Sequence, residues 1–463
     1  MYLKRNLLLL FVLSVIIYSC GKKGGDTPPP PPPPSTPGCT TNAAPANGSF
    51  VTTNSVTLSW NSAGGATGYD VYVGTSATGA TVVASNVSST SYSFSIPATA
   101  TSVTYYWYVV PKNTAGIASS CSSGASSFTY AVIAAPPPFG YYVVGYLPSY
   151  RNVASIPDVK FRMTNVVVYA FYGVNSSGTI TAPASPSSTL AAVRDKARAN
   201  GSKIFLGIND GVAGNFKNMA STASGRTNFI KAVMNEVRNT NLDGVDMDWE
   251  FPSTSDGTDV TFTALMKELS DSLHRDSRYY LSTAITAGKY AGGYRDAIRN
   301  EIFPYVDFFN IMAYDDFSTS VPYRQHSDYT LASVCLNYWL VTRGMPASKC
   351  VLGVPCYGRP SGITQSGTVL TYSGILGQGG SPLSDSAIVT AGSFTNYTIY
   401  YNGQYTTKRK AKLAKDVANG VMFWEKGQDV HDNNSLLKAA CDTIGRSYYL
   451  FILKFLSRVL FHR

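Results

Sequence analysis

Two patterns of hydrophobic and polar positions divide the chain. Between residues 39 and 132, short runs alternate apolar with polar residues and are separated by clusters of Gly, Ser, Asn and Pro. Such alternation is typical of half-buried β-strands, and many short strands with turn-rich connections predict an all-β sandwich. We expect Trp60, Tyr69, Val71 and Trp107 to fill its core.

Beyond residue 140, short apolar strands alternate with amphipathic helices, which is typical of parallel β-α-β units. Eight strand candidates begin at Tyr142, Asn165, Lys203, Leu242, Tyr279, Val306, Cys350 and Gly420. Eight such units over about 300 residues predict a (β/α)8 barrel, for which ~250 residues plus insertions is typical. The predicted fold class is therefore α/β, with a TIM barrel over residues 141–443 and a small N-terminal all-β sandwich domain.

The first residues carry a targeting pattern. A basic start, MYLKR, precedes the apolar run NLLLLFVLSVII, which is too short to span a membrane comfortably, and then YSC. This order predicts an export signal over residues 1–20. A small residue before Cys20 resembles the cleavage site of bacterial lipoproteins, in which the cysteine is lipidated and anchors the protein to the membrane; a simple secretory signal is the alternative. We expect an outer-membrane or cell-surface lipoprotein of a bacterium, or a secreted protein.

Three segments lack the pattern of a folded domain. Residues 21–38 contain seven consecutive prolines, which impose an extended geometry and predict a stalk. Residues 133–140 form a second Pro-rich linker. Residues 444–463 are basic and apolar, but Lys454 and Arg458 interrupt a run already too short to cross a bilayer. The sequence does not separate two interpretations of this segment, an interfacial amphipathic helix and a processing tail.

The formal net charge of +10 raises the question of a nucleic-acid partner. Residues 1–38 contribute +3 and residues 444–463 contribute +4, which leaves +3 for the folded body. This is too little for a basic groove, so nucleic acid is not an expected partner. The 32 tyrosines and the many small polar residues are typical of an extracellular surface, and such surfaces often bind sugars.

Export makes disulfides available to the chain. Cys39 and Cys121 bracket the predicted sandwich, so we pair them. No pairing is predicted for the four cysteines of the barrel segment, Cys335, Cys350, Cys356 and Cys441. The histidines His274, His326 and His431 show no ligand spacing, so we predict no metal. We also predict no cofactor and a monomeric protein.

The stretch LDGVDMDWEFP, residues 242–252, places Asp246, Asp248 and Glu250 two positions apart on a predicted strand. Residues two apart lie on one side of a strand, with Cα atoms about 6.6 Å apart, and in a barrel this side is the interior. Three carboxylates on one buried face cannot all ionise, because like charges raise at least one pKa. Glu250 lies at the strand end where barrel enzymes place their chemistry, so we predict a general acid for a glycosidic oxygen.

Two interpretations without catalysis compete with this one. A calcium loop also uses acids at alternate positions, but it needs a central Gly turn and polar intervening residues, whereas Val, Met and Trp intervene here. A solvent-exposed acidic strand would lack these apolar neighbours. Both explain the stretch less well than an active site.

The same stretch resembles the D-G-x-D-x-D-W-E segment of glycoside hydrolase family 18, the chitinases and endo-β-N-acetylglucosaminidases. The stretches VVGYLPSY, YAF, NIMAYD, LGVPCYGR and GVMFWE fall where that family would have them, on the first, second, sixth, seventh and eighth strands. This resemblance covers residues 141–443. The stretches GATGYDVYVGT and TYYWYVVPKNTAG resemble a fibronectin type III-like module, which would occupy residues 39–132.

The family resemblance implies roles for individual residues. Glu250 would protonate the leaving oxygen, and the N-acetyl carbonyl of the substrate would attack the sugar, with retention of configuration. Asp248 would orient the acetamido group and pass its proton toward Asp246 or Glu250, and Tyr314 would donate a hydrogen bond to the acetamido oxygen. The residues expected to bind substrate are Trp424, as the apolar floor under the sugar, and Met312, Asp315, Tyr146, Phe171 and Arg359.

One stretch departs from the family pattern. Where the family usually has S-x-G-G at the end of the third strand, this chain has GIND, residues 207–210. The usual serine hydroxyl for the inner aspartate is absent there, and Asn209 and Asp210 add side chains beside the cleft. The implied function is hydrolysis of β-1,4 bonds at N-acetylglucosamine in chitin. Cleavage of N-glycan cores and a catalytically weak, sugar-binding barrel are the alternatives.

Overall fold

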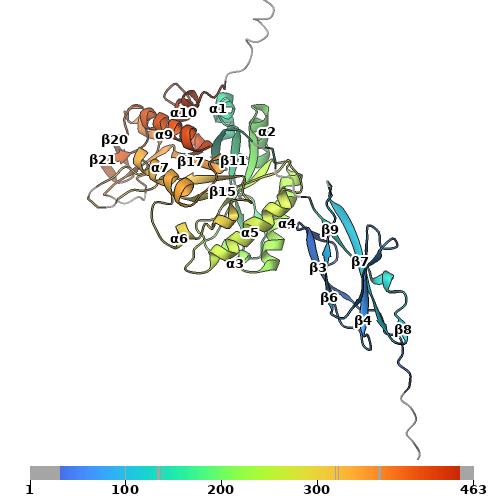
Figure 1. The fold of residues 1–463 in the computed structure, drawn as a ribbon. Helices are drawn as coiled ribbons and strands as arrows, with labels where there is room; N and C mark the ends of the chain where they lie inside the picture. The colour runs from blue at the N-terminus through green and yellow to red at the C-terminus, as the bar shows by residue number, and fades with distance from the viewer. Residues whose placement is uncertain are drawn as a thin grey trace, which may run out of the picture. The chain divides into compact units, whose positions relative to one another are not determined.

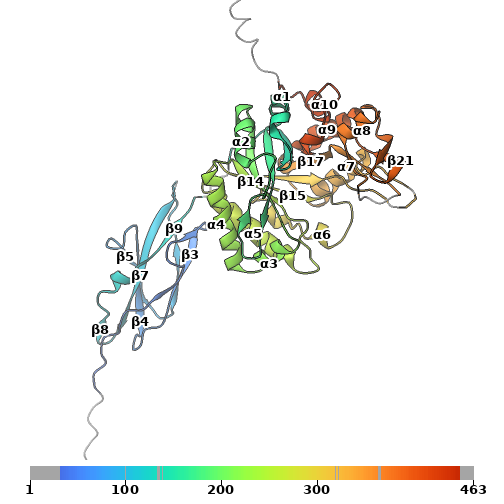
Figure 2. The ribbon, with the colours of Figure 1, turned by 180° about the vertical axis from the view of Figure 1, so that it is seen from behind.

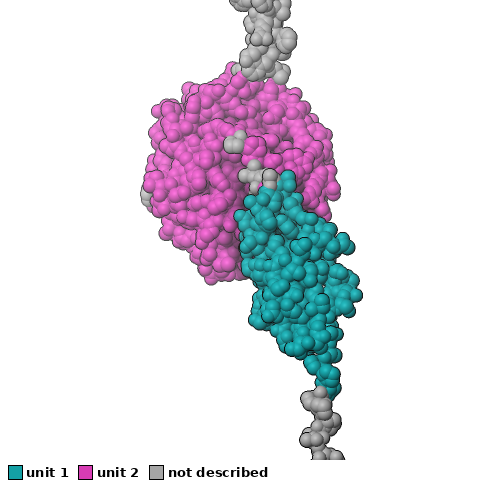
Figure 3. Space-filling model, turned by 45° about the vertical axis from the view of Figure 1, so that its right-hand side comes forward, with its two compact units in different colours: residues 1–130 teal, residues 131–463 magenta. Residues whose placement is uncertain are grey.

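A computed structural model of the protein describes residues 32–99, 101–132, 136–137, 139–318, 320–321, 323–362 and 367–448. The chain divides into two compact units, residues 1–130 and 131–463 (Figure 3). The predicted export signal with Cys20 lies outside the described residues, as do parts of both predicted linkers and most of the C-terminal tail. In the part of the chain that is described, no helix is long and apolar enough to cross a bilayer.

Two sheets form the first unit (Figure 1). One sheet has the order β1 (Asn42–Ala44), β3 (Ser55–Trp60), β6 (Ser91–Ser95). The other has the order β2 (Ser49–Val51), β9 (Ser126–Tyr130), β7 (Val103–Asn113), β4 (Gly68–Gly74), β5 (Thr81–Val87), with β8 (Gly116–Ile117) on β7. Trp60, Tyr69, Val71 and Trp107 are buried in one core between the sheets, as predicted. Cys39 forms a disulfide with Cys121.

Eight parallel strands close into a barrel in the second unit (Figures 1 and 2). The strands are β10 (Tyr142–Pro148), β11 (Val166–Val174), β13 (Lys203–Asn209), β14 (Gly244–Asp248), β15 (Tyr280–Thr286), β16 (Phe308–Met312), β17 (Cys350–Pro355) and β22 (Gly420–Trp424). They neighbour one another in chain order, and pairing of β10 with both β11 and β22 closes the ring. The predicted (β/α)8 barrel and its eight strands are confirmed.

Helices surround the barrel, and most of them bury an apolar face. The helices are α1 (Asp158–Met163), α2 (Leu190–Ala199), α3 (Asn215–Ala220), α4 (Ala223–Asn239), α5 (Thr258–Leu273), α6 (Gly293–Asp296), α7 (Tyr329–Leu336), α8 (Tyr372–Gly377), α9 (Gln404–Val417) and α10 (Leu436–Ile444). In α4, for example, the Thr222 side chain caps the first turn and Phe229, Val233 and Val237 repeat every four residues on the buried face.

Short additional strands extend the second unit. β12 (Ile180–Thr181) pairs with β11. The insertion between β17 and β22 forms a small sheet in the order β19 (Leu370–Thr371), β18 (Tyr357–Pro360), β21 (Phe394–Tyr400), β20 (Ser386–Ala391). This insertion carries Tyr357 and Arg359 to the rim of the barrel.

The alternation of side chains along β14 orients the acidic stretch. Trp249, which follows the strand, packs outward on the helices: its ring stacks on Phe216 of α3 at 5.2 Å and meets Phe262 of α5 edge-on at 5.7 Å. Asp246 and Asp248 are three positions and one position before Trp249, so their side chains point to the other side of the strand. They therefore lie on the inner side of the barrel, as predicted from the spacing.

Candidate active site

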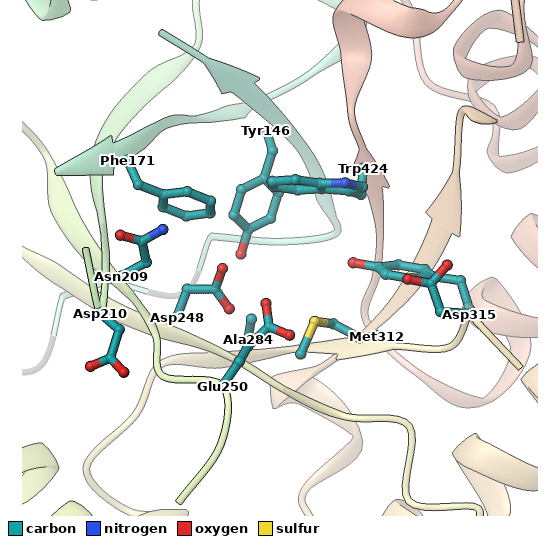
Figure 4. Close-up of a pocket in the computed structure, with 11 residues that line it drawn as sticks. Tyr146, Phe171, Asn209, Asp210, Asp248, Glu250, Ala284, Met312, Asp315 and Trp424 are labelled. Carbon is teal, nitrogen blue, oxygen red and sulfur yellow. The ribbon is translucent and has the colours of Figure 1, made fainter. Parts of the chain in front are cut away.

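The carboxyl ends of the barrel strands surround a cavity of about 260 Å³ (Figure 4). Asn209, Asp248, Met312 and Trp424 are the last residues of β13, β14, β16 and β22. The other residues of the lining are Tyr146, Phe171, Asp210, Glu250, Ala284, Tyr314 and Asp315. Barrel enzymes place their chemistry at this end of the strands.

The cavity gathers most of the residues predicted from the sequence. Its lining contains three predicted catalytic residues, Asp248, Glu250 and Tyr314, and the predicted substrate-binding residues Tyr146, Phe171, Met312, Asp315 and Trp424. Asp246 and Arg359 are not part of the lining. Asp246 is fully buried beside Asp248, and Arg359 reaches the cavity through an ion pair with Asp315.

Asp246 is held by three hydrogen-bond donors from three strands. Tyr146 donates its hydroxyl at 2.6 Å, Ser282 its hydroxyl at 2.5 Å, and Asn310 its side-chain amide at 3.1 Å. Burial raises the pKa of Asp246, and these donors oppose the increase because they stabilise the carboxylate. Ser282 of β15, the register partner of Asp246, thus gives this aspartate a hydroxyl donor although the GIND stretch offers none.

Ser282 and Asn310 were missed at the level of the sequence, although a signal was present. Ser282 lies in YLSTAIT and Asn310 in the otherwise apolar FFNIM, and both are fully buried. A buried polar side chain in such a strand needs a partner, which indicates a polar network inside the barrel.

Ser282→Ala is expected to destabilise the barrel by about 1–3 kcal/mol, because it removes a hydrogen bond to a buried carboxylate. Calorimetric unfolding at pH 7 measures the change. Ser386→Ala, at an exposed position of β20, is the matched control and should change stability by no more than about 0.5 kcal/mol. Equal stability of the two variants would contradict a role of Ser282 in holding Asp246.

Asp248 lies between the other two acids in the sequence, and one of its two carboxylate oxygens lacks a donor among the described residues. Its side chain is 6% exposed, and among the described residues its Oδ1 atom has no hydrogen-bond partner. Burial raises the pKa of Asp248 well above the ordinary value, and the charges of Glu250 and Asp246 raise it further. A buried, unpaired carboxylate oxygen is costly, and the side chain that carries it lines the cavity (Figure 4). It suits a ligand that brings an N–H or O–H donor.

Glu250 follows the end of β14 by two residues and is exposed to solvent. Partial burial of its carboxyl group nevertheless raises its pKa, and the negative charge of Asp315 raises it further. Glu250 therefore keeps its proton to a higher pH than an ordinary glutamate. This is the property that a general acid requires.

Asp315 supplies that negative charge because its partners keep it ionised. Burial acts to raise its pKa, but interactions with His326, Arg359 and Tyr357 hold the pKa at about 2. The Tyr357 hydroxyl donates to Oδ1 at 2.5 Å and the Arg359 guanidinium donates to Oδ2 at 3.0 Å. The insertion between β17 and β22 thus fixes one wall of the cavity.

Aromatic rings form another wall of the cavity. Trp424 stacks on Phe171 with ring centroids 5.7 Å apart and planes 17° apart, and meets Tyr146 at 5.3 Å. Flat apolar rings beside carboxylates suit the faces of a sugar ring (Figure 4). Within the described ranges, no group of three or more His, Cys, Asp or Glu side chains is arranged to hold a metal ion.

Comparison with known proteins connects this geometry to a family. The sequence model of "Glycosyl hydrolases family 18" matches residues 142–429, more than half of the chain. Chitotriosidase-1 of Mus musculus is 32% identical over 168 residues, which are 31% of this chain and 35% of that protein. Endochitinase 1 of Metarhizium robertsii is 26% identical over 267 residues, which are 50% of this chain and 62% of that protein. The chain thus spans less than two thirds of either relative.

A solved structure shares the barrel. The GH18 chitinase ChiB from the chitin utilization locus of Flavobacterium johnsoniae matches with a TM-score of 0.53 and 26% sequence identity. The match covers 66% of this chain and 94% of that chain.

Proposed function

The chain belongs to glycosyl hydrolase family 18, and from this premise we propose that it is a chitinase-type glycosidase that cleaves β-1,4 bonds at N-acetylglucosamine with retention of configuration. The observation that carries the proposal is Asp248, which lines the cavity and whose buried Oδ1 atom has no hydrogen-bond partner among the described residues. The N–H group of a substrate acetamido group satisfies this oxygen. No second protein carboxylate is then needed as the nucleophile.

Each step of substrate-assisted catalysis has a residue in the cavity. Glu250 protonates the oxygen of the breaking bond, and the acetamido carbonyl oxygen of the substrate attacks the anomeric carbon to form an oxazolinium ion. Asp248 accepts the hydrogen bond of the acetamido N–H and stabilises the positive charge, with Asp246 behind it. The Tyr314 hydroxyl lines the same cavity and donates to the acetamido oxygen. Glu250, now ionised, then takes a proton from a water molecule. The oxygen of this water attacks the anomeric carbon and opens the oxazolinium ring.

Chitin is the proposed substrate, with cleavage of N-glycan cores as the alternative. The names of both curated relatives and of the solved barrel, all chitinases or chitotriosidases, support chitin. A weakly catalytic, sugar-binding barrel is less well supported, because the acid series Asp246, Asp248 and Glu250 is complete.

The segments outside the barrel are proposed to hold the enzyme at the place where it meets its substrate. Export, lipidation at Cys20 and a proline-rich stalk would place a monomeric enzyme at a bacterial surface, where polysaccharide is met. The two-sheet module at residues 39–132 is proposed as a fibronectin type III-like spacer. The two sheets with a shared aromatic core support a sandwich module in this position.

The test is to incubate the wild-type protein with chitohexaose and with a high-mannose N-glycopeptide, and to follow products by mass spectrometry and early anomers by proton NMR. We expect chitohexaose to be cleaved with the β-anomer formed first. Early α-anomer would refute retention. Cleavage of the glycopeptide alone would mean that N-glycans, and not chitin, are the substrate. Binding of either compound without turnover would favour the sugar-binding alternative.

A further inference from the structure

The GIND stretch places two polar side chains where the S-x-G-G pattern of the family has glycines. Asn209 is the last residue of β13, Asp210 follows it, and both line the catalytic cavity. The carboxylate of Asp210 is used by the chain itself. Its Oδ2 atom accepts from the backbone N–H of Gly214 at 2.8 Å, and its Oδ1 atom accepts from that of Phe216 at 2.6 Å. Asp210 therefore supports the loop that leads into α3.

Asn209 differs from Asp210 because only one end of its amide is used. Its Oδ1 atom accepts from the backbone N–H of Gly211 at 3.0 Å. This bond fixes the orientation of the amide, because the opposite orientation would bring two donors together. In Figure 4 the amide nitrogen lies on the side of Phe171. Among the described residues, this nitrogen has no hydrogen-bond partner, so Asn209 offers a donor of fixed direction to a ligand.

Asn209 also lies at the junction of two cavities. A larger cavity of about 560 Å³ adjoins the catalytic cavity, and the residues that line both are Phe171, Trp424 and Asn209. Asn209 is the polar member of this set. The acids Asp248 and Glu250 line the catalytic cavity but not the larger one. Asn209 is, in addition, the register partner of Asp248 in the neighbouring strand.

The part of the substrate that meets Asn209 follows from the chemistry, and this step rests on the proposed function. The catalytic sugar has its C2 acetamido group at Asp248 and its C1 atom at Glu250. A β-1,4 chain continues from C4, across the ring from C1, and therefore enters the larger cavity, which Glu250 does not line. C3 lies between C2 and C4. Its hydroxyl group is thus placed between Asp248 and the larger cavity, where Asn209 lies.

We infer that Asn209 is a specificity-determining residue whose amide nitrogen donates a hydrogen bond to the 3-hydroxyl oxygen of the catalytic sugar. A few fixed polar groups of this kind set the specificity of a sugar site. A substituent on the same oxygen, such as the lactyl ether of N-acetylmuramic acid, meets the Asn209 side chain, whereas a glycine would leave that space open. The substrate class is therefore a polymer of N-acetylglucosamine with free 3-hydroxyl groups, and not the alternating polymer of bacterial cell walls.

The experiment uses three 4-methylumbelliferyl chitobiosides that differ only at C3 of the catalytic sugar, which carries a hydroxyl group, a hydrogen atom or a lactyl ether. The quantity compared is the ratio of kcat/KM on the 3-hydroxyl substrate to kcat/KM on the 3-deoxy substrate. We expect Asn209→Ala to lower this ratio about fivefold, the size of one neutral hydrogen bond. A ratio within one variant cancels any general effect of the substitution on the fold. Asn209→Gly, which matches the family pattern, should lower the ratio equally.

The control and the third substrate complete the test. Asn218→Ala should keep the wild-type ratio, since Asn218 is exposed on α3 and lines none of the four cavities described for the barrel unit. The wild-type protein should cleave the 3-O-lactyl substrate at least about tenfold more slowly than the 3-hydroxyl substrate, because the ether adds bulk as well as removing the hydroxyl group.

Two results would overturn the inference while leaving the proposed function intact. One is a ratio that neither Asn209→Ala nor Asn209→Gly changes, and the other is equal turnover of the 3-hydroxyl and 3-O-lactyl substrates by the wild-type protein. A wild-type protein that hydrolyses none of the three substrates would instead refute the proposed function, and the inference with it.

Discussion

Glu250→Gln is expected to lower kcat/KM on chitin oligosaccharides by about 10²–10⁴-fold, the usual contribution of a general acid. Glutamine keeps the shape of the side chain but cannot donate a proton to the leaving oxygen. Because the pKa of Glu250 is raised, turnover by the wild-type protein should also depend on pH. In the wild type, turnover should fall as the pH rises through this raised pKa, because the carboxylate form cannot act as the acid.

Steady-state kinetics from pH 4 to pH 9 would measure both effects. Glu301→Gln is the matched control, because Glu301 is an exposed glutamate in a short helical turn outside the cavity and should keep wild-type kinetics. A Glu250→Gln enzyme with more than about a tenth of wild-type kcat/KM would rule out Glu250 as the acid. In that case another proton donor of the cavity would have to be sought.

Asp248→Asn is expected to have two opposite effects. It should lower kcat by about 10²–10³-fold, because the amide cannot stabilise the positive charge that develops on the acetamido group. It should also raise the melting temperature by roughly 2 °C or more at pH 8, because it removes a buried charge that is unpaired among the described residues. Loss of activity together with a gain of stability distinguishes a functional acid from a structural one.

The sign of the stability effect follows from proton linkage. Burial, Glu250 and Asp246 raise the pKa of Asp248 in the folded protein above its value of ~3.9 in the unfolded chain. The folded state then binds more protons, so wild-type stability falls as the pH rises from about 4 through the raised pKa. The advantage of the Asn variant should therefore be smaller at pH 4 than at pH 8.

Calorimetry at the two pH values, beside kinetics, would check both parts. The control is Asp195→Asn, which changes an aspartate whose side chain is 68% exposed and should alter neither activity nor the pH dependence of stability. A destabilised Asp248→Asn protein would show that Asp248 is paired in the resting enzyme. It would thereby remove the observation on which the proposed function rests.

The sequence by itself determined the barrel and the core of the site. Alternation along a strand and the lengths of helices are local properties, so the eight strands and the inner side of Asp246 and Asp248 followed from spacing alone. Most residues of the cavity lining were named from the family motifs at strand ends, since the carboxyl ends of all barrel strands meet on one face; Ala284 was not.

The tertiary structure decided which residues contact one another across the site. Ser282 and Asn310 reach Asp246 from positions 36 and 64 residues away, and Arg359 reaches Asp315 across 44 residues from an insertion with its own sheet. Tyr294 meets Phe251 only because a loop after β15 returns to the end of β14. Hydrogen bonds and ring contacts depend on distances of a few ångströms between distant segments, and closure of the barrel sets those distances.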